Sequence, residues 1–329
     1  MACGGIKTDT SEKGLEALIA ADMTGRRIED LGAPAGGGVS EEPEPFVGLH
    51  NWLLGDPKAY DRAWTVDLVQ LRAFVAATQP PMLAALDLDN DSPTRQKFLA
   101  RLQGEIGKRG VIDVLRHGVK HGQHDVDLFY GTPSPGNARA AARFALNRFS
   151  VTRQLRYSRD DTAHALDLAL FINGLPVATF ELKNSLTKQT VEDAVEQYKR
   201  DRDPREKLFE FGRCMVHFAV DDAQAMFCTH LKGKASWFLP FNKGYNDGAG
   251  NPPNPGGLKT DYLWKDILAP LGQTVTVGEG RAYVFVAIEH ANSEIVGIHA
   301  SKSAWGAARL TETSGCGKFH RNWRFGNGL

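Results

Sequence analysis

Residues 165–184 read ALDLALFINGLPVATFELKN and carry the strongest structural signal in the chain. Two apolar, strand-like runs, 165–172 and 175–182, flank the pair Asn173-Gly174. Both residues of such a pair tolerate the positive φ of a tight hairpin turn. The stretch therefore predicts a β-hairpin of two largely buried strands.

Two charged residues interrupt these apolar runs, Asp167 and Glu181, and a third, Lys183, directly follows the second run. The two-residue period of a strand places Glu181 and Lys183 on the same face. The position of Asp167 depends on the turn. A two-residue turn sets it opposite Phe180, on the wrong face, whereas a three-residue turn sets it opposite Glu181. The sequence leaves both registers open.

In the second register, the three charged residues share one face of apolar strands, where unpaired charges are costly. Two adjacent carboxylates repel each other, and a divalent cation removes that penalty. Few, hard oxygen ligands suit Mg²⁺, and a nearby lysine can orient water or stabilise charge on a phosphate. This register therefore indicates phosphodiester hydrolysis. A surface ion pair of Lys183 with Asp167 or Glu181 is the alternative interpretation.

The residues around the hairpin predict the rest of the sheet. Further strand-like runs stand at 151–157, 213–220, 225–230 and 282–288. A helix is predicted over 190–200, where Thr190 and Asp193 resemble a capping box. This order of helices and strands predicts an α/β fold with a mixed central sheet flanked by helices.

The N-terminal part is expected to be largely helical. Helices are predicted over 10–23, with Thr10 or Ser11 as the cap, over most of 58–118, and after Asn137 as far as Arg148. We expect four regions: an N-terminal helix and flexible link (1–45), a mostly helical portion (46–150), a core (151–270), and a C-terminal strand and tail (271–329).

Charge, apolar runs and cysteine spacing narrow the range of functions and locations expected for this chain. The 329 residues include 39 basic and 39 acidic side chains, so bulk charge gives no argument for nucleic-acid binding. The charge is nevertheless uneven, with an acidic segment at 1–50 and a basic one at 301–329. No apolar run approaches the roughly 18 residues of a membrane span, so no membrane association is expected. The spacing of the four cysteines indicates reduced thiols and a cytoplasmic location.

The hairpin resembles the nuclease motif of the restriction (R) subunit of type I restriction-modification enzymes, which belongs to the PD-(D/E)xK superfamily. The resemblance spans roughly residues 8–270. The matching stretches outside the hairpin are Tyr60-Asp61-Arg62, Asn90-Asp91-Ser92-Pro93-Thr94-Arg95, Arg109-Gly110-Val111-Ile112-Asp113, Asp127-Leu128-Phe129-Tyr130-Gly131-Thr132-Pro133-Ser134-Pro135 and Phe238-Leu239-Pro240-Phe241-Asn242. It implies a metal-dependent DNA endonuclease with a restriction-endonuclease-like core.

The resemblance also implies which residues form the site. The metal-binding acids fall on Asp167 and Glu181, and the motif lysine falls on Lys183, which favours the register that pairs the two acids. Leu166 replaces the motif's proline, a departure that spares the acid. The implied cofactor is Mg²⁺.

Two further features of the family match this chain only in part. Its glutamate on the first helix falls on Glu12 or Glu16, and a solvated helix face is the alternative interpretation of each. Its glutamine and tyrosine, four residues apart on the next helix, do not match the adjacent Gln197 and Tyr198. Tyr198 is therefore equally well interpreted as a core residue.

The implied partners are double-stranded DNA and the modification and specificity subunits of the same complex, with the specificity subunit reading the DNA sequence. ATP is expected only for the family's motor domain, which we do not expect within these residues. The stretch Ser314-Gly315-Cys316-Gly317-Lys318-Phe319 does not complete a phosphate-binding loop. The alternative function is a non-catalytic module that docks to the partner subunits through the helical residues 46–120.

Overall fold

The computed structural model describes residues 12–32, 52–133, 136–160, 164–246 and 248–268, and the backbone of three strands between 274 and 301. The chain forms two compact units, one ending at Gly272 and the other beginning at Gln273. The predictions for the link 33–45, for the caps Thr10 and Ser11, and for the stretch 314–319 lie outside the described residues.

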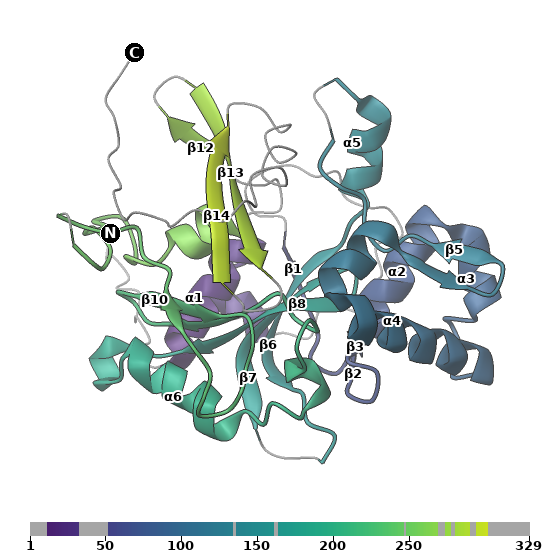
Figure 1. The fold of residues 1–329 in the computed structure, drawn as a ribbon, viewed down its shortest axis with the longest axis horizontal. Coiled ribbons are helices and arrows are strands. Elements are labelled where there is room, and N and C mark those ends of the chain that lie inside the picture. The colour runs from purple at the N-terminus through teal and green to yellow at the C-terminus, as the bar shows by residue number, and fades with distance from the viewer. Residues whose placement is uncertain are drawn as a thin grey trace, which may run out of the picture. The chain divides into compact units, whose positions relative to one another are not determined.

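The first unit is built on a seven-stranded sheet in the order β1-β6-β7-β8-β9-β10-β11 (Figure 1). The strands are β1 (Leu53–Leu54), β6 (Phe149–Arg156), β7 (Ala165–Ile172), β8 (Leu175–Leu182), β9 (Val216–Val220), β10 (Ala225–Cys228) and β11 (Leu239–Pro240). The pairs β1–β6 and β8–β9 are parallel and the others are antiparallel. The predicted α/β fold with a mixed sheet is confirmed.

The central hairpin combines features of both predicted registers. Its turn is the two-residue form, because Ile172 pairs directly with Leu175. Both turn residues have positive φ, 50° for Asn173 and 83° for Gly174. Beyond the turn, the pairing shifts by one residue, and Val177 on β8 is the extra residue of a β-bulge. Bulges are among the few places where a strand tolerates proline, which has no N–H to donate, and Pro176 is adjacent.

The bulge changes which residues face each other further along the hairpin. Leu168 pairs with Phe180. Continuing this register by one residue places Asp167 opposite Glu181. The two acids therefore meet although the turn has only two residues. The predicted dependence of the register on turn length alone was wrong, because a bulge beyond the turn shifts the pairing by one residue.

The hairpin turn is buried rather than exposed to solvent. The Asn173 side chain accepts a hydrogen bond from the Arg148 N–H at 2.6 Å and donates to the Leu128 carbonyl at 2.8 Å. The Gly174 carbonyl accepts from the N–H of Asp67 at 2.9 Å. These bonds satisfy polar groups that would otherwise be buried without partners, and they attach the turn to the segments around it.

Helix α6 (Val191–Asp201) provides the crossover between the parallel strands β8 and β9. Its N-terminus has the predicted capping box, in which the Thr190 N–H donates to the Asp193 carboxylate at 2.8 Å. Its buried residues include Val191, Ala194 and Tyr198, which pack in the core with strand residues of the sheet. Helix α1 (Glu12–Thr24) contacts β6 and β8.

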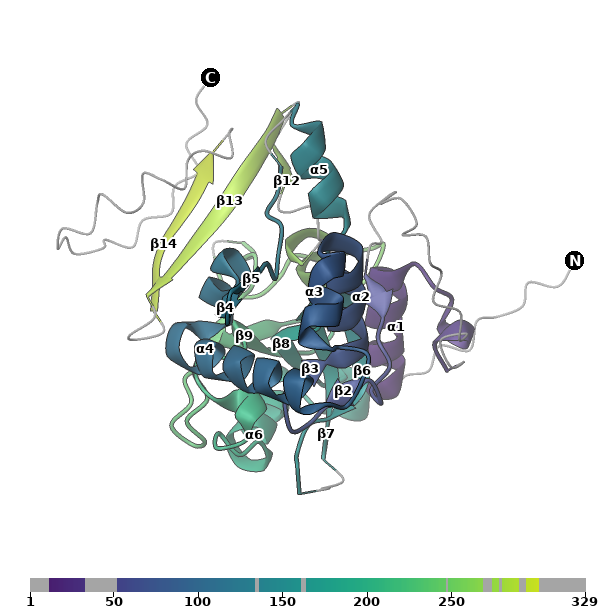
Figure 2. The same cartoon turned by 90° about the vertical axis from the view of Figure 1, so that its right-hand side faces the viewer.

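The region predicted as mostly helical also contains short strands. Helices α2 (Leu68–Thr78), α3 (Pro80–Leu86) and α4 (Pro93–His117) confirm the helical prediction, and α3 contacts both of the others (Figure 2). Short strands precede and follow them: β2 (Tyr60–Asp61), β3 (Val66–Asp67), β4 (Val119–His121) and β5 (His124–Val126). Strands of two or three residues are too short to show a periodic pattern in the sequence.

Other boundaries differ by a few residues. Helix α5 (Ala138–Ala145) has Asn137 as its cap, as predicted, but ends before Arg148. The second unit is a three-stranded antiparallel sheet of β12 (Thr274–Val277), β13 (Gly280–Glu289) and β14 (Glu294–Ser301), of which only the central strand was predicted. Among the described helices, none has the length and apolar character needed to cross a membrane.

We expect Gly174→Ala to lower the free energy of unfolding by at least about 2 kcal/mol. A Cβ at this position would lie 2.4 Å from the Asp67 carbonyl oxygen and 2.7 Å from the Leu71 nitrogen, and positive φ alone costs other residues about 1–2 kcal/mol. Gly122→Ala is the matched control, because Gly122 also has positive φ but its Cβ would contact nothing. Urea unfolding of both variants measures the difference, and equal losses would contradict the close packing of the turn.

Candidate functional site

The structure brings the three predicted site residues together at one end of the hairpin. Asp167 is half-buried on β7, Glu181 is fully buried on β8, and Lys183 follows directly after β8 and is almost fully buried. The Asp167 Oδ2 atom accepts a hydrogen bond from the Leu182 N–H at 2.8 Å. Asp167 and Lys183 are both close enough to Glu181 to act on its charge.

Glu181 forms a buried ion pair with Arg202, the residue after helix α6. The Arg202 Nε atom donates to Glu181 Oε1 at 2.6 Å, and the exposed fractions of the two side chains are 2% and 0%. Further contacts hold the guanidinium, among them a hydrogen bond to the Ala165 carbonyl at 2.8 Å and the ring of Tyr157 at 5.6 Å. The ion pair therefore holds one Glu181 oxygen in a defined position.

The second oxygen of Glu181 is available for a ligand. Among the described residues, no hydrogen-bond donor reaches the buried Oε2 atom. Burial raises the pKa of Glu181 to about 8, an effect that Arg202 reduces and Asp167 increases. A buried carboxylate oxygen without a partner, next to a second carboxylate, fits a divalent cation.

This donor set is small. Within the described part of the chain, no group of three or more His, Cys, Asp or Glu side chains is arranged to hold a metal ion. Asp167 and Glu181 would supply two carboxylates, and the other positions would fall to water and phosphate oxygens. That division is typical of Mg²⁺, which usually retains several waters.

Of the two candidate glutamates on the first helix, Glu16 lies near the site. It is 1% exposed, and its Oε1 atom pairs with the Arg153 Nε at 2.6 Å. Its Oε2 atom accepts from the Gln154 side-chain amide, which also donates to Asp167 Oδ1 at 3.4 Å. The backbone of Glu12 begins α1, but its side chain is outside the described set.

Tyr198 lies near the site acids Asp167 and Glu181, and its hydroxyl is also hydrogen-bonded within the core. It is fully buried, and its hydroxyl forms a 2.8 Å hydrogen bond with the Thr179 hydroxyl. Thr179 is also 2.8 Å from the Nδ1 atom of His217. Because Thr179 lies two residues before Glu181, this buried chain of hydrogen bonds supports the face that carries the carboxylate. Gln197, one residue earlier on α6, is only half-buried.

Neither Arg202 nor Gln154 was predicted from the sequence as part of the site. Arg202 follows Tyr198 by four residues, a spacing that puts both on one side of a helix, so a basic residue on the buried side was a usable signal. The helix was instead expected to end at Arg200. Gln154 gives no comparable signal, because its contact depends on a backbone conformation that its sequence context does not predict.

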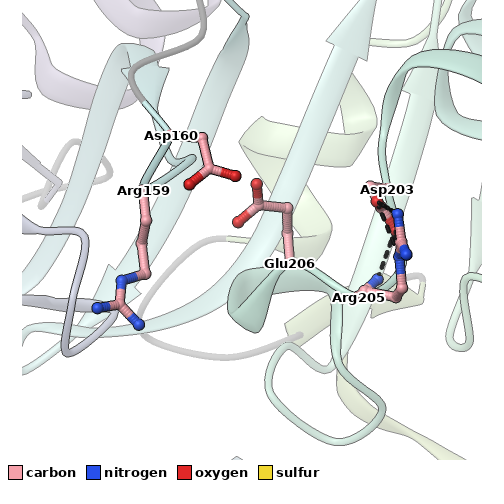
Figure 3. A pocket seen from close by; sticks show the side chains of 5 residues that line it. All are labelled: Arg159, Asp160, Asp203, Arg205 and Glu206. Carbon is pink, nitrogen blue, oxygen red and sulfur yellow. Dashed lines mark hydrogen bonds and ion pairs between the residues drawn. The ribbon is translucent and has the colours of Figure 1, made fainter.

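A separate, open pocket of about 580 Å³ lies between the segment that follows β6 and the segment that follows α6 (Figure 3). It is lined by Arg159, Asp160, Asp203, Arg205 and Glu206. Asp203 pairs with Arg205 at 2.7 Å, and Glu206 accepts from the Ser158 hydroxyl at 2.6 Å. None of the predicted site residues lines this pocket, so the hairpin remains the candidate site.

We expect His217 to make the protein less stable in acid. Burial, and to a lesser extent His230, lowers the pKa of His217 to about 3. Below its ordinary value of about 6.5, the unfolded chain takes up a proton that the folded chain does not, so stability falls as the pH falls from 6.5 towards 3. The slope for this one group is about 1.4 kcal/mol per pH unit.

His217→Asn isolates this effect, because an amide does not titrate in this range and can still bond to Thr179. The free energy of unfolding in urea at pH 7, 6 and 5 should fall less steeply for the variant than for the wild type. Parallel pH profiles for the two proteins would contradict a neutral, buried His217.

Comparison with known families agrees with the resemblance seen in the sequence. The family model described as "Type I restriction enzyme R protein N terminus" matches residues 97–236, which include the hairpin, α6 and Arg202. No significant match is found among curated proteins.

Proposed function

We propose that this chain is the nuclease part of the R subunit of a type I restriction-modification enzyme and hydrolyses DNA phosphodiester bonds with Mg²⁺. One observation carries the proposal. Within the residues that match the R-protein family, the bulged hairpin sets Asp167 opposite Glu181, and Lys183 follows on the face of Glu181.

The proposed roles follow from the chemistry of these groups. Asp167 and the Oε2 atom of Glu181, which no donor among the described residues reaches, would hold the metal ion. When bound, Mg²⁺ supplies a positive charge beside the scissile phosphate and lowers the pKa of coordinated water. Lys183 would orient the attacking water or stabilise charge on the phosphate. Its low exposure, 7%, strengthens its electrostatic effect relative to a solvated lysine.

Arg202 would assist by fixing Glu181 without filling the site. It binds Oε1 and leaves Oε2 without a donor among the described groups. A buried carboxylate without a counter-charge destabilises the fold. The positive charge of Arg202 therefore lowers the free-energy cost of an ionised Glu181 inside the sheet. Lys183 also acts on the charge of Glu181, and Oε2, which no described donor reaches, is the oxygen that a divalent cation would bind.

The proposed partners are double-stranded DNA and the modification and specificity subunits of the same complex. ATP would act only through a motor domain elsewhere in the R subunit. The net charge of this chain is zero, so it would not attract DNA by bulk electrostatics. The partner subunits would therefore have to supply most of the affinity for DNA.

We expect Asp167→Ala and Lys183→Ala each to reduce Mg²⁺-dependent cleavage of supercoiled plasmid by at least about 100-fold. The assay uses the chain assembled with its partner subunits and with a second R subunit that carries the motor. The nuclease site of that second R subunit is inactivated, so that any cleavage comes from the chain under test. Asp125→Ala and Lys188→Ala are matched controls, because both residues are exposed and lie outside the site. Circular dichroism checks that all four variants remain folded.

Undiminished cleavage by both site variants would contradict the proposal. A wild type that binds the partner subunits but never cleaves, with or without Mg²⁺, would instead favour the docking function.

A further inference from the structure

Gln154 has an unusual backbone conformation for a residue inside a strand. Its φ is +49°, in the left-handed region, and it lies within β6. Residues other than glycine, asparagine and aspartate rarely have a positive φ. Where one of them does, it often lies at a functional site. The conformation therefore needs an explanation from what the side chain contacts.

The pairing of β6 with β7 places Gln154 beside the proposed metal site. Arg153 pairs with Leu168 and Leu155 pairs with Leu166, so Gln154 lies across from Asp167. Asp167 in turn lies across from Glu181 on the other side. One row across three strands thus contains an amide and two carboxylates.

The side-chain amide of Gln154 lies between two acids from different elements. Its Nε2 atom donates to Glu16 Oε2 on α1 and to Asp167 Oδ1 on β7. An amide nitrogen carries two hydrogens, one for each carboxylate, whereas the amide oxygen in that position would repel both. Asp167 also accepts from Leu182 on its other oxygen, so donors on two sides fix its carboxylate.

We propose that Gln154 is a positioning residue that sets the orientation of Asp167 and connects Glu16 to the metal site. This inference rests on the proposed function. A neutral donor shared by two acids reduces their repulsion without adding a cation that would compete with the metal. Outer contacts of this kind typically change metal affinity by about 10- to 100-fold when they are removed.

The competing explanation is that Gln154 only fastens α1 to the sheet, a task in which Arg153 already takes part through its ion pair with Glu16. The two explanations differ in the predicted metal affinity. Fastening affects the stability of the metal-free protein, whereas positioning also affects the Mg²⁺ concentration that stabilises it.

Gln154→Ala and Gln154→Gly, made in the full chain, separate the two explanations. Both variants remove the amide, but only glycine accepts the positive φ without strain. Unfolding temperature is measured against Mg²⁺ concentration, with Mg²⁺ as the only added ligand. We expect both variants to need about 10-fold more Mg²⁺ than the wild type for half of the stabilisation, and the glycine variant to unfold at a higher temperature than the alanine variant without Mg²⁺.

Asn246→Gly is the control, because Asn246 also has positive φ, 50°, and is exposed outside the site. It should leave the Mg²⁺ dependence unchanged. Wild-type Mg²⁺ dependence in Gln154→Ala would overturn the role of Gln154 alone. A wild type that Mg²⁺ does not stabilise, or stabilisation that survives in Asp167→Ala, would overturn the metal site together with it.

Discussion

The register between β7 and β8 is the constraint on which the candidate site depends. A shift of one residue would move Asp167 to the opposite face from Glu181. Two features fix the register, the tight turn at Asn173-Gly174 and the bulge at Val177. The Val177 carbonyl accepts from the Met215 N–H at 2.9 Å, so the backbone beside β9 also supports the bulge.

The turn connects this register to the N-terminal part of the first unit. Gly174 packs against the backbone of Asp67 and Leu71, at the start of α2, at distances that leave no room for a side chain. Asn173 satisfies backbone groups of Leu128 and Arg148. The N-terminal helices and loops therefore contribute to the site indirectly, because they bury the turn from which the register is counted.

The cost of burying charge explains the arrangement around Glu181. A carboxylate inside an apolar sheet is unfavourable, and its raised pKa expresses this. Arg202 offsets part of the cost through Oε1, while Asp167 adds repulsion. Gln154, Asp167 and Glu181 accordingly lie in one row on consecutive strands, and the rest of β7 is apolar.

Local sequence determined much of the fold. The two apolar runs and the Asn-Gly pair predicted the bounds of β7 and β8, and the Thr190–Asp193 pair predicted the start of α6, because each signal depends only on neighbouring residues. Short strands such as β2 and β4 were missed, since two or three residues carry no period. The resemblance in the hairpin indicated Asp167, Glu181 and Lys183, and the family match covers all three.

Only the tertiary structure decided how these residues meet. The bulge at Val177 depends on pairing with β7 and on backbone contacts with β9, and the positive φ of Gln154 is not encoded by the residues beside it. Arg202 reaches Glu181 from the end of a helix 21 residues further along the chain. Such contacts join segments distant in sequence, and their geometry is fixed by packing and by the cost of burying unpaired charge, which no local pattern records.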